Sequence, residues 1–559
     1  MNKTVKIIVA LFIVMALGSC TKDWLDINKD PNRPAAPELS KLLPFGELNM
    51  TLSLSQGDFI GNWLSSYVHQ LVYREVQNYG MTPAGNGSNG IGNSWEYMYT
   101  YTLKDYDALI EYAEPEGNMI YAGIAKTLKA YTFSMMVDLW GDIPYSEYNH
   151  VPELSAPKPD NSKDIYNSII ALLEEAKTDL QDADAENILT PGDDDFFYVG
   201  DVKKWVSLNN TIELKLLLQS RKAKSDITDW QSKFNALMTE NNFIASGDDF
   251  QFWFTKNTSP SDERHPGYRD EYGGGQQTYY ISPYFFEIMN GSTLNATDNP
   301  LAGITDPRIP YYFFNQLSGG DPQNPLEYRN GDFASIFFAS NGPNSAMAND
   351  ASLTKIGLYL CGGKYDDGKG GKISKFAQGN GIAPHKMITY AALKFMLAEL
   401  AITGETSGDA RTLLSDGIEA AMAHVNTVAA MQTEVPEISA PDISDYVDAV
   451  LAKYDAADAA GKLRIIMTEK WIHNVFNPID SYSDYRRTGY PTLFDPQKTQ
   501  DPGFGVNPTV VDKSPARVPL MTFAAFPRSL YYPTTVETNL NPNMVQKTNL
   551  STPFVFWDK

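Results

Sequence analysis

The feature that most constrains this fold is a pair of apolar stripes at helical spacing. One stripe covers 393–401, the other covers 410–422, and Gly404 and Gly408 interrupt the pattern between them. Apolar residues that recur every three or four positions line one face of an α-helix. Two such helices, with a short link and small residues on their facing sides, predict an antiparallel hairpin of the tetratricopeptide type.

Weaker versions of this pattern occur near 95–140 and 163–222, so we expect a mostly α-helical chain with helix pairs as its scaffold. The stretch 248–384 differs, because its periodicity is poor and it is rich in Gly, Asn, Pro and Tyr. Long irregular stretches in compact proteins are usually functional or disordered, and aromatic density argues against disorder. We therefore expect short strands and the ligand site there.

These patterns predict a single folded domain over 46–559. Two parts of it, at about 46–247 and 385–480, should form the helical scaffold. The irregular region at 248–384 lies between them in sequence, and a loop-rich C-terminal part at 481–559 follows the second.

The N-terminus is typical of a secretory signal. Two lysines precede an unbroken apolar run from Ile7 to Leu17, which is too short to span a bilayer. Small residues and Cys20 follow, and this exit resembles the lipobox of bacterial lipoproteins. The resemblance implies a cleaved signal peptide at 1–19, lipidation of Cys20 and a proline-bearing tether at 20–45. An ordinary signal peptide with a chance cysteine is the alternative.

The composition disfavours several classes of binding partner. The chain has 45 basic and 68 acidic residues, a formal charge of −23, which disfavours nucleic acids and anionic membrane surfaces. No second apolar run is long enough to cross a bilayer, so we expect membrane attachment through the lipid only. Cys361 is the only other cysteine, and it has no disulfide partner within the chain if Cys20 carries lipid.

A helix from about Ile120 is predicted to end at Gly141, because glycine often caps helices and Pro144 prevents continuation. The string DLWGDIPY at this end resembles a motif of the SusD/RagB family of outer-membrane nutrient-binding lipoproteins. Further stretches resemble family motifs in the family's order: 25–32, 396–401, 469–491 and 527–533. In the last of these, Ser529 stands where the family usually has a second arginine.

The resemblance implies a mostly α-helical SusD-like fold and a role as the cell-surface binding subunit of a nutrient uptake complex. Its partner would be a SusC-like TonB-dependent barrel in the outer membrane, with the lipid-anchored protein facing the exterior. The expected ligand is an oligosaccharide; an oligopeptide and, less favoured, a surface glycoside hydrolase role are the alternatives. We expect no cofactor and no enzymatic activity, because no catalytic or metal-binding constellation is recognisable.

Aromatic side chains among polar residues are the candidate ligand contacts. Sugar rings stack on flat aromatic faces, while hydroxyl, amide and carboxylate groups bind the sugar hydroxyls. For each such residue, packing within a loop is the alternative interpretation. The candidates are Trp95, Trp253, Tyr272, Tyr279, Tyr280 and Tyr328.

Three other patterns predict no site. Gly85, Gly87 and Gly90 match a dinucleotide-binding spacing, but no strand precedes them and we expect a flexible loop. Segment 26–32 imitates the start of a calcium loop, but prolines occupy the positions of its glycine and its final acid. Charged residues of the family-like motifs are expected to form structural ion pairs: Asp142, Asp484, Arg486 and Arg487.

Overall fold

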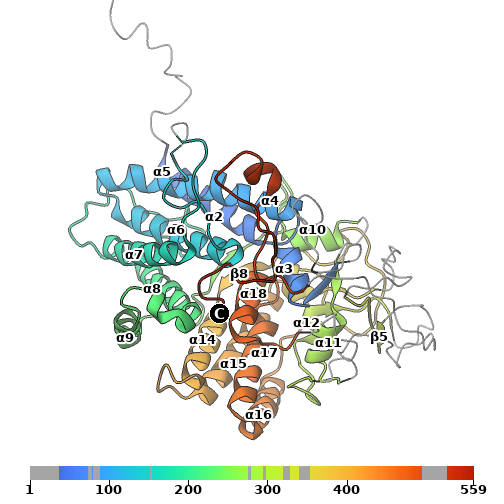
Figure 1. Cartoon of the computed structure of the whole chain (residues 1–559). Coiled ribbons are helices and arrows are strands. Elements are labelled where there is room, and N and C mark those ends of the chain that lie inside the picture. Colours follow the sequence, from blue (N-terminus) through green and yellow to red (C-terminus); the bar gives the residue numbers. More distant parts are fainter. Residues whose placement is uncertain are drawn as a thin grey trace, which may run out of the picture.

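The computed structural model is dominated by helices, which confirms the predicted mostly α-helical fold (Figure 1). Cys20, the signal peptide and the calcium-like segment lie outside the residues that it describes. No helix among the described residues combines the length and apolar character needed to cross a membrane. The structure describes residues 37–73, 79, 88–150, 154–274, 279–293, 298–318, 328–338, 353–493 and 525–559.

The N-terminal half is built around one long helix, α6, whose residues are nearly all buried. Helix α7 packs along it, and α5 precedes it in an antiparallel pair (Figure 1). The elements of this half are α2 (Leu39–Leu54), α3 (Gly61–Tyr67), α4 (Ser88–Glu96), the π-helix η2 (Tyr97–Leu103), α5 (Lys104–Ala113), the 3-10 turn η3 (Glu114–Glu116), α6 (Met119–Trp140), α7 (Ser162–Leu180), α8 (Val202–Gln219), the 3-10 turn η4 (Arg221–Asp226) and α9 (Trp230–Glu240).

Helix α6 ends at Gly141, as its sequence predicts. The Gly141 amide donates to the Val137 carbonyl at 2.8 Å, and its φ of +77° is a conformation that residues with a Cβ rarely adopt. A Cβ at this position would lie 2.3 Å from the Phe554 carbonyl oxygen. Glycine is therefore required both for the turn and for the close approach of the C-terminal segment.

The second helical part contains the predicted hairpin. Helices α14 (Tyr390–Ile402) and α15 (Ala410–Ala429) pack against each other. Thr389 caps α14 by accepting from the Ala392 amide, and Asp409 caps α15 by accepting from the Arg411 amide. The remaining helices are α16 (Ala440–Ala456), α17 (Ala459–His473) and α18 (Pro478–Thr488).

The irregular region contains short strands, as predicted, and several short helices. The described strands of the chain pair only in twos, and each pair is antiparallel. The pairs join β1 (Leu71–Tyr73) to β3 (Tyr279–Ile281), β2 (Phe250–Trp253) to β8 (Pro384–Ile388), β4 (Phe313–Phe314) to β7 (Lys355–Ile356) and β5 (Tyr328–Asn330) to β6 (Phe333–Ser335). The helices are α10 (Pro266–Tyr272), α11 (Pro283–Met289), α12 (Ile309–Tyr312) and α13 (Leu358–Cys361).

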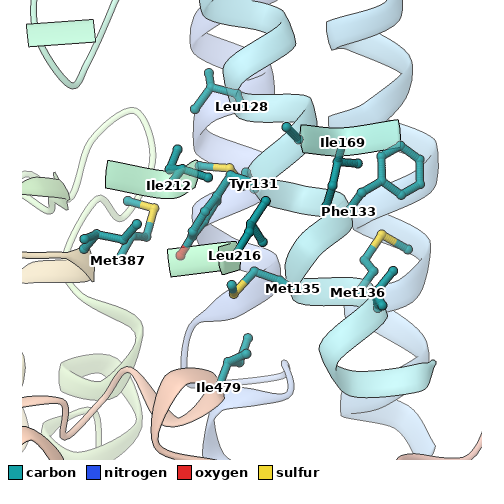
Figure 2. Packing of buried hydrophobic residues seen from close by; sticks show 14 of the residues in the cluster. Leu128, Tyr131, Phe133, Met135, Met136, Ile169, Ile212, Leu216, Met387 and Ile479 are labelled. Carbon is teal, nitrogen blue, oxygen red and sulfur yellow. The ribbon is translucent and has the colours of Figure 1, made fainter. Parts of the chain in front are cut away.

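Two large hydrophobic clusters hold these parts together. The first joins the N-terminal helices to α14 and to the C-terminal segment 525–559, and the second joins the irregular region to α14–α17. Figure 2 shows Tyr131 and Met135 of α6 facing Ile212 and Leu216 of α8, with Ile479 of α18 close by. Segments far apart in sequence therefore share one core.

Two boundaries differ from those expected. Helix α2 begins at Leu39, inside the stretch assigned to the tether, and it contains Pro44 in its second turn, where proline removes one backbone hydrogen bond of the helix. Helix α18 continues the scaffold to Thr488. Beyond it, the short π-helix η5 (Thr534–Thr538) is the only helix among the described residues, 489–493 and 525–559.

Candidate functional site

Two stacked tyrosines lie at the edge of the irregular region. Tyr73 ends β1 and Tyr279 begins β3, and the ladder register places them directly opposite each other. Their ring centroids are 4.8 Å apart with an interplanar angle of 27°. Trp63 of α3 lies 5.1 Å from the Tyr73 ring. Both tyrosines are half-buried, so the three rings form an aromatic face of which part reaches the solvent.

Polar groups surround this aromatic face. Burial raises the pKa of the Tyr279 hydroxyl, and the neighbouring Tyr73 and Asp270 raise it further, so the hydroxyl stays protonated and able to donate. Partial desolvation, followed by the charge of Asp58, raises the pKa of Asp270 to about 6. Asn62 lowers the pKa of both groups through its side-chain amide.

This arrangement is suited to binding a neutral hydroxylated ring. The aromatic rings offer apolar surface for C–H groups, and the phenol, amide and carboxylates offer donors and acceptors for hydroxyls. Such a combination of apolar surface and a few polar groups is what small-ligand sites use for affinity and orientation. We call Trp63, Tyr73 and Tyr279 the aromatic face.

Three of the predicted tyrosines are buried instead. The Tyr272 hydroxyl donates to the Ile356 carbonyl at 2.7 Å and accepts from the Lys364 amide at 2.9 Å. The Tyr328 hydroxyl donates to Glu287 at 2.7 Å. Tyr280 is fully buried in a small apolar cluster with Val72. The structure therefore brings only Tyr279 of these four tyrosines to the partly exposed face.

Trp253 lines a different cavity of about 470 Å³. Leu48, Leu52 and Phe196 supply much of its apolar wall. Both carboxylates of its lining already have partners, since Arg264 donates to Asp262 and the Thr255 hydroxyl donates to Glu263 at 2.6 Å.

Trp95 lies in helix α4, which also contains Gly90, so the expectation of a flexible loop is wrong at Gly90. Trp95 is 2% exposed, and its indole nitrogen donates to Glu537 at 3.2 Å. It forms the floor of a third cavity, which is described below because its chemistry differs from that of the aromatic face.

Sequence reasoning missed Trp63, Tyr73 and Asn62. Trp63 and Asn62 belong to a short helix, and Tyr73 ends a three-residue strand. The aromatic face exists because β1 pairs with β3 from a distant part of the chain, a pairing that local periodicity does not encode. The only local signal was at Tyr73, an aromatic residue that directly follows Leu71 and the β-branched Val72 and so favours a strand.

The charged motif residues form a buried network, which agrees with the structural role expected of them. Arg487 donates to Glu399 and to Asp484, and both partners are nearly or fully buried. Arg486 donates to the Asp138 and Arg528 carbonyls, while Asp142 accepts from the Ser162 amide at the start of α7. These contacts connect α14, α18 and the C-terminal segment.

Comparisons with known proteins bear on the whole chain. A family model described as SusD-like, "Starch-binding associating with outer membrane", matches residues 31–507. No curated protein matches the chain by sequence.

Several solved structures share the fold. A SusD homologue from Bacteroides fragilis is 19% identical, with a TM-score of 0.66 over 94% of this chain and 99% of its own. A SusD/RagB family protein from Bacteroides thetaiotaomicron is 20% identical, with a TM-score of 0.64 over 94% and 99%. A chitin-binding SusD homologue from Flavobacterium johnsoniae is 19% identical, with a TM-score of 0.61 over 92% and 98%.

At such low identity the solved structures establish the fold alone, while the family model rests on the sequence itself. Both cover most of the chain. The chain therefore belongs to the SusD/RagB family.

Proposed function

We propose that this protein captures oligosaccharides at the cell surface and delivers them to a SusC-like TonB-dependent transporter. Family membership makes it a nutrient-binding protein of the outer membrane. The observation that carries the choice of ligand is the aromatic face, where the Tyr73–Tyr279 stack meets Asn62 and two carboxylates. The chitin-binding relatives provide support of the same kind, because they use this fold for a saccharide.

The proposed mechanism is binding without chemistry. A sugar ring packs its C–H surface on the exposed part of a tyrosine ring, and the Tyr279 hydroxyl and Asn62 amide orient its hydroxyl groups. Asp58 and Asp270 accept hydrogen bonds from the ligand, and their charge disfavours acidic saccharides. The protein transforms nothing, so release into the transporter depends on loss of these contacts alone.

Calorimetric titration of a soluble form that starts after Cys20 tests the ligand class. We expect at least one neutral oligosaccharide from a glycan panel to bind, with no turnover of the ligand. Replacing Tyr73 and Tyr279 by alanine should weaken that binding about tenfold or more, which corresponds to about 1.4 kcal/mol. The matched control is Tyr112→Ala, because Tyr112 is 36% exposed on α5, and it should bind normally.

Three outcomes would contradict the proposal. Tight binding of an oligopeptide, with no glycan bound by any member of the panel, would favour the peptide alternative. Hydrolysis of a bound glycan by the purified protein would identify an enzyme instead. A gentle detergent extraction that never recovers a TonB-dependent barrel with the full-length protein would contradict the proposed partnership.

We also propose that lipid on Cys20 anchors the protein to the outer membrane, facing outward. The lipobox-like exit and the proline-bearing tether support this attachment. Cells that express Cys20→Ala and are fed labelled fatty acid should show no labelled protein, and surface retention should be lost. Affinity for the ligand should persist, because the first described helix, α2, begins at Leu39, well beyond Cys20.

A further inference from the structure

A cavity of about 350 Å³ lies between the N-terminal helices and the C-terminal segment. Figure 1 shows the C-terminal segment, in dark red, passing beside α4. Trp95, Tyr99 and Tyr148 provide its aromatic surface, and it shares no residue with the aromatic face. We call it the Trp95 pocket. Its volume falls in the lower part of the range found for small-molecule sites.

Two π-helical turns line the Trp95 pocket. One is η2, which contributes Tyr99 and Thr100, and the other is η5, which contributes Thr535 and Glu537. Isolated π-turns are rare and occur disproportionately at functional sites, because the extra residue per turn redirects side chains. Two of them facing one cavity are an observation independent of the cavity itself.

The pocket is acidic. Glu96 and Glu537 line it, whereas no lysine or arginine does. In the part of the chain that the structure describes, neither glutamate takes part in an ion pair. Glu537 accepts from the Trp95 indole at 3.2 Å and from the Asn541 amide at 2.8 Å. Burial raises the pKa of Glu537. A cation bound in the pocket would lower this pKa again, because it favours the charged form of the carboxylate.

The aromatic rings are arranged around the same space. The Trp95 and Tyr99 ring centroids are 5.0 Å apart at 56°, and those of Tyr99 and Tyr148 are 5.7 Å apart at 52°. The Tyr99 hydroxyl donates to the Pro144 carbonyl at 2.7 Å, and the Tyr148 hydroxyl donates to Asp107. Because both hydroxyls are used within the protein, the rings offer π surface, which attracts cations.

We propose that the Trp95 pocket binds a sugar ring that carries a primary ammonium group. Carboxylates beside tilted aromatic rings recognise the ammonium by charge and by cation–π attraction. The exposed Thr100 and Thr535 at the walls provide hydroxyls for the hydroxyl groups of the ring. The proposal does not depend on the aromatic face, and it would stand if that face bound a peptide.

Glucosamine is the probe, titrated by calorimetry against the soluble protein at about pH 6.5, where an ordinary amine is protonated. The comparison ligands are glucose and N-acetylglucosamine, which have the ring without the charge. We expect glucosamine to bind at least tenfold more tightly than either, and to bind more weakly in high salt. Equal binding of N-acetylglucosamine would overturn the proposal, and so would equal binding of butylamine, which has the charge without the ring.

Variants assign the binding to this pocket. Glu537→Gln should weaken glucosamine binding at least tenfold, while the exposed Glu111→Gln on α5 is the matched control and should not. Tyr99→Leu should weaken it and Tyr99→Phe should retain it, because the ring and not the hydroxyl contacts the ligand. Thermal melts verify that each variant is folded. Undiminished binding by folded Glu537→Gln would overturn the assignment.

A background variant separates the two sites. Glucosamine binding should survive alanine replacement of Tyr73 and Tyr279, which removes two rings of the aromatic face. Loss of glucosamine binding in that double variant, with the Trp95 pocket intact, would place the sugar at the aromatic face and overturn this proposal. Loss of oligosaccharide binding alone would leave it supported.

Discussion

Glu399 is the central acceptor of the buried charge network. It is fully buried and accepts from Arg487 and, at 3.3 Å, from Arg221. Glu399→Gln keeps the shape but removes one of the two carboxylates, Glu399 and Asp484, to which the guanidinium of Arg487 donates. We expect a loss of about 3–5 kcal/mol in the free energy of unfolding, the usual consequence of breaking a buried ion pair. Urea denaturation followed by circular dichroism measures it.

The matched control for Glu399→Gln is Asp455→Asn. This variant breaks the surface ion pair between Asp455 and Arg411, whose two side chains are each about half exposed. Surface ion pairs contribute about 0–1 kcal/mol, so this control should shift the midpoint little. A similar shift for both variants would show that the buried network does not stabilise the fold more than a surface pair.

Buried histidines predict that stability falls in acid. Burial, followed by the charge of Lys386, lowers the pKa of His385 and His424 to about 3. Both are neutral when folded, whereas in the unfolded chain they take up protons below about pH 6.5. The unfolded state therefore binds more protons between about pH 3 and 6.5, and the free energy of unfolding decreases as the pH falls through that window.

His424→Gln removes one of these two contributions. Tyr359 and Gln251 contact the two ring nitrogens of His424 at 2.9 and 2.7 Å, while Asp249 lies at 4.0 Å. We expect the variant to be less stable at neutral pH but to lose stability less steeply between about pH 6.5 and 4. Denaturation curves at several pH values measure the slope. The exposed His150→Gln is the control, and an unchanged slope in His424→Gln would contradict the expectation.

At the residue scale the sequence located aromatic residues but not their exposure. Tyr279 and Tyr280 are adjacent, yet strand alternation turns the second into the core and leaves the first half-buried. Their neighbours in space, Trp63 and Tyr73, come from elements with no strong periodicity. Which member of an aromatic pair reaches solvent depends on a register that only the folded structure supplies.

Helix pairs depend on small residues where the helices approach. An added Cβ at Gly417 of α15 would lie 2.7 Å from the Phe395 ring of α14. We expect Gly417→Ala to destabilise the protein by about 1–3 kcal/mol, because overpacking outweighs the better helix propensity of alanine. Thermal melting measures the effect.

Gly92→Ala in α4 is the matched control for Gly417→Ala. Its added Cβ would meet only the Pro533 Cβ at 3.9 Å, which is an ordinary contact. Without a clash, the gain in helix propensity should dominate, and this variant should be neutral or more stable by up to about 1 kcal/mol. A stabilised Gly417→Ala would show that α14 and α15 are not tightly packed there.

At the element scale, strong apolar periodicity predicted helices correctly, whereas composition gave a wrong prediction for one of them. Helices α14 and α15 and the end of α6 at Gly141 were predictable because apolar spacing and capping residues are local signals. Helix α4 was not, since its glycines, asparagines and serines favour loops. Tertiary contacts hold it: the Ser94 hydroxyl donates to the Ser53 carbonyl at 2.7 Å and accepts from the Ile60 amide at 3.1 Å.

The C-terminal segment connects the whole molecule although it has little regular structure. The Leu530 amide donates to the Leu139 carbonyl at 3.0 Å, and the Trp140 indole donates to the Tyr531 carbonyl at 3.1 Å. Lys547 is buried and donates to the Trp140 carbonyl at 2.6 Å. The sequence predicted loops here, but its lack of periodicity concealed that these loops complete the core around the end of α6.

Trp557 tests whether the molecule unfolds as one body. It is fully buried, its indole donates to Asp138 at 2.9 Å, and the Arg486 guanidinium lies 4.6 Å from its ring. Trp557→Ala removes a large side chain from the shared core and leaves Asp138 with one fewer donor, so we expect a loss of about 3–5 kcal/mol. Because the first hydrophobic cluster runs from Leu39 to Trp557, the unfolding midpoint of the entire N-terminal half should fall.

Val545→Ala in the same segment is the control, since Val545 is 79% exposed and its truncation should change stability by less than about 0.5 kcal/mol. Tryptophan fluorescence and circular dichroism, recorded through urea denaturation, should shift together in Trp557→Ala. A biphasic curve, in which the helical signal keeps its original midpoint, would mean that the C-terminal segment detaches separately. The segment would then cover the core without contributing to its cooperativity, contrary to what its buried contacts with α6 imply.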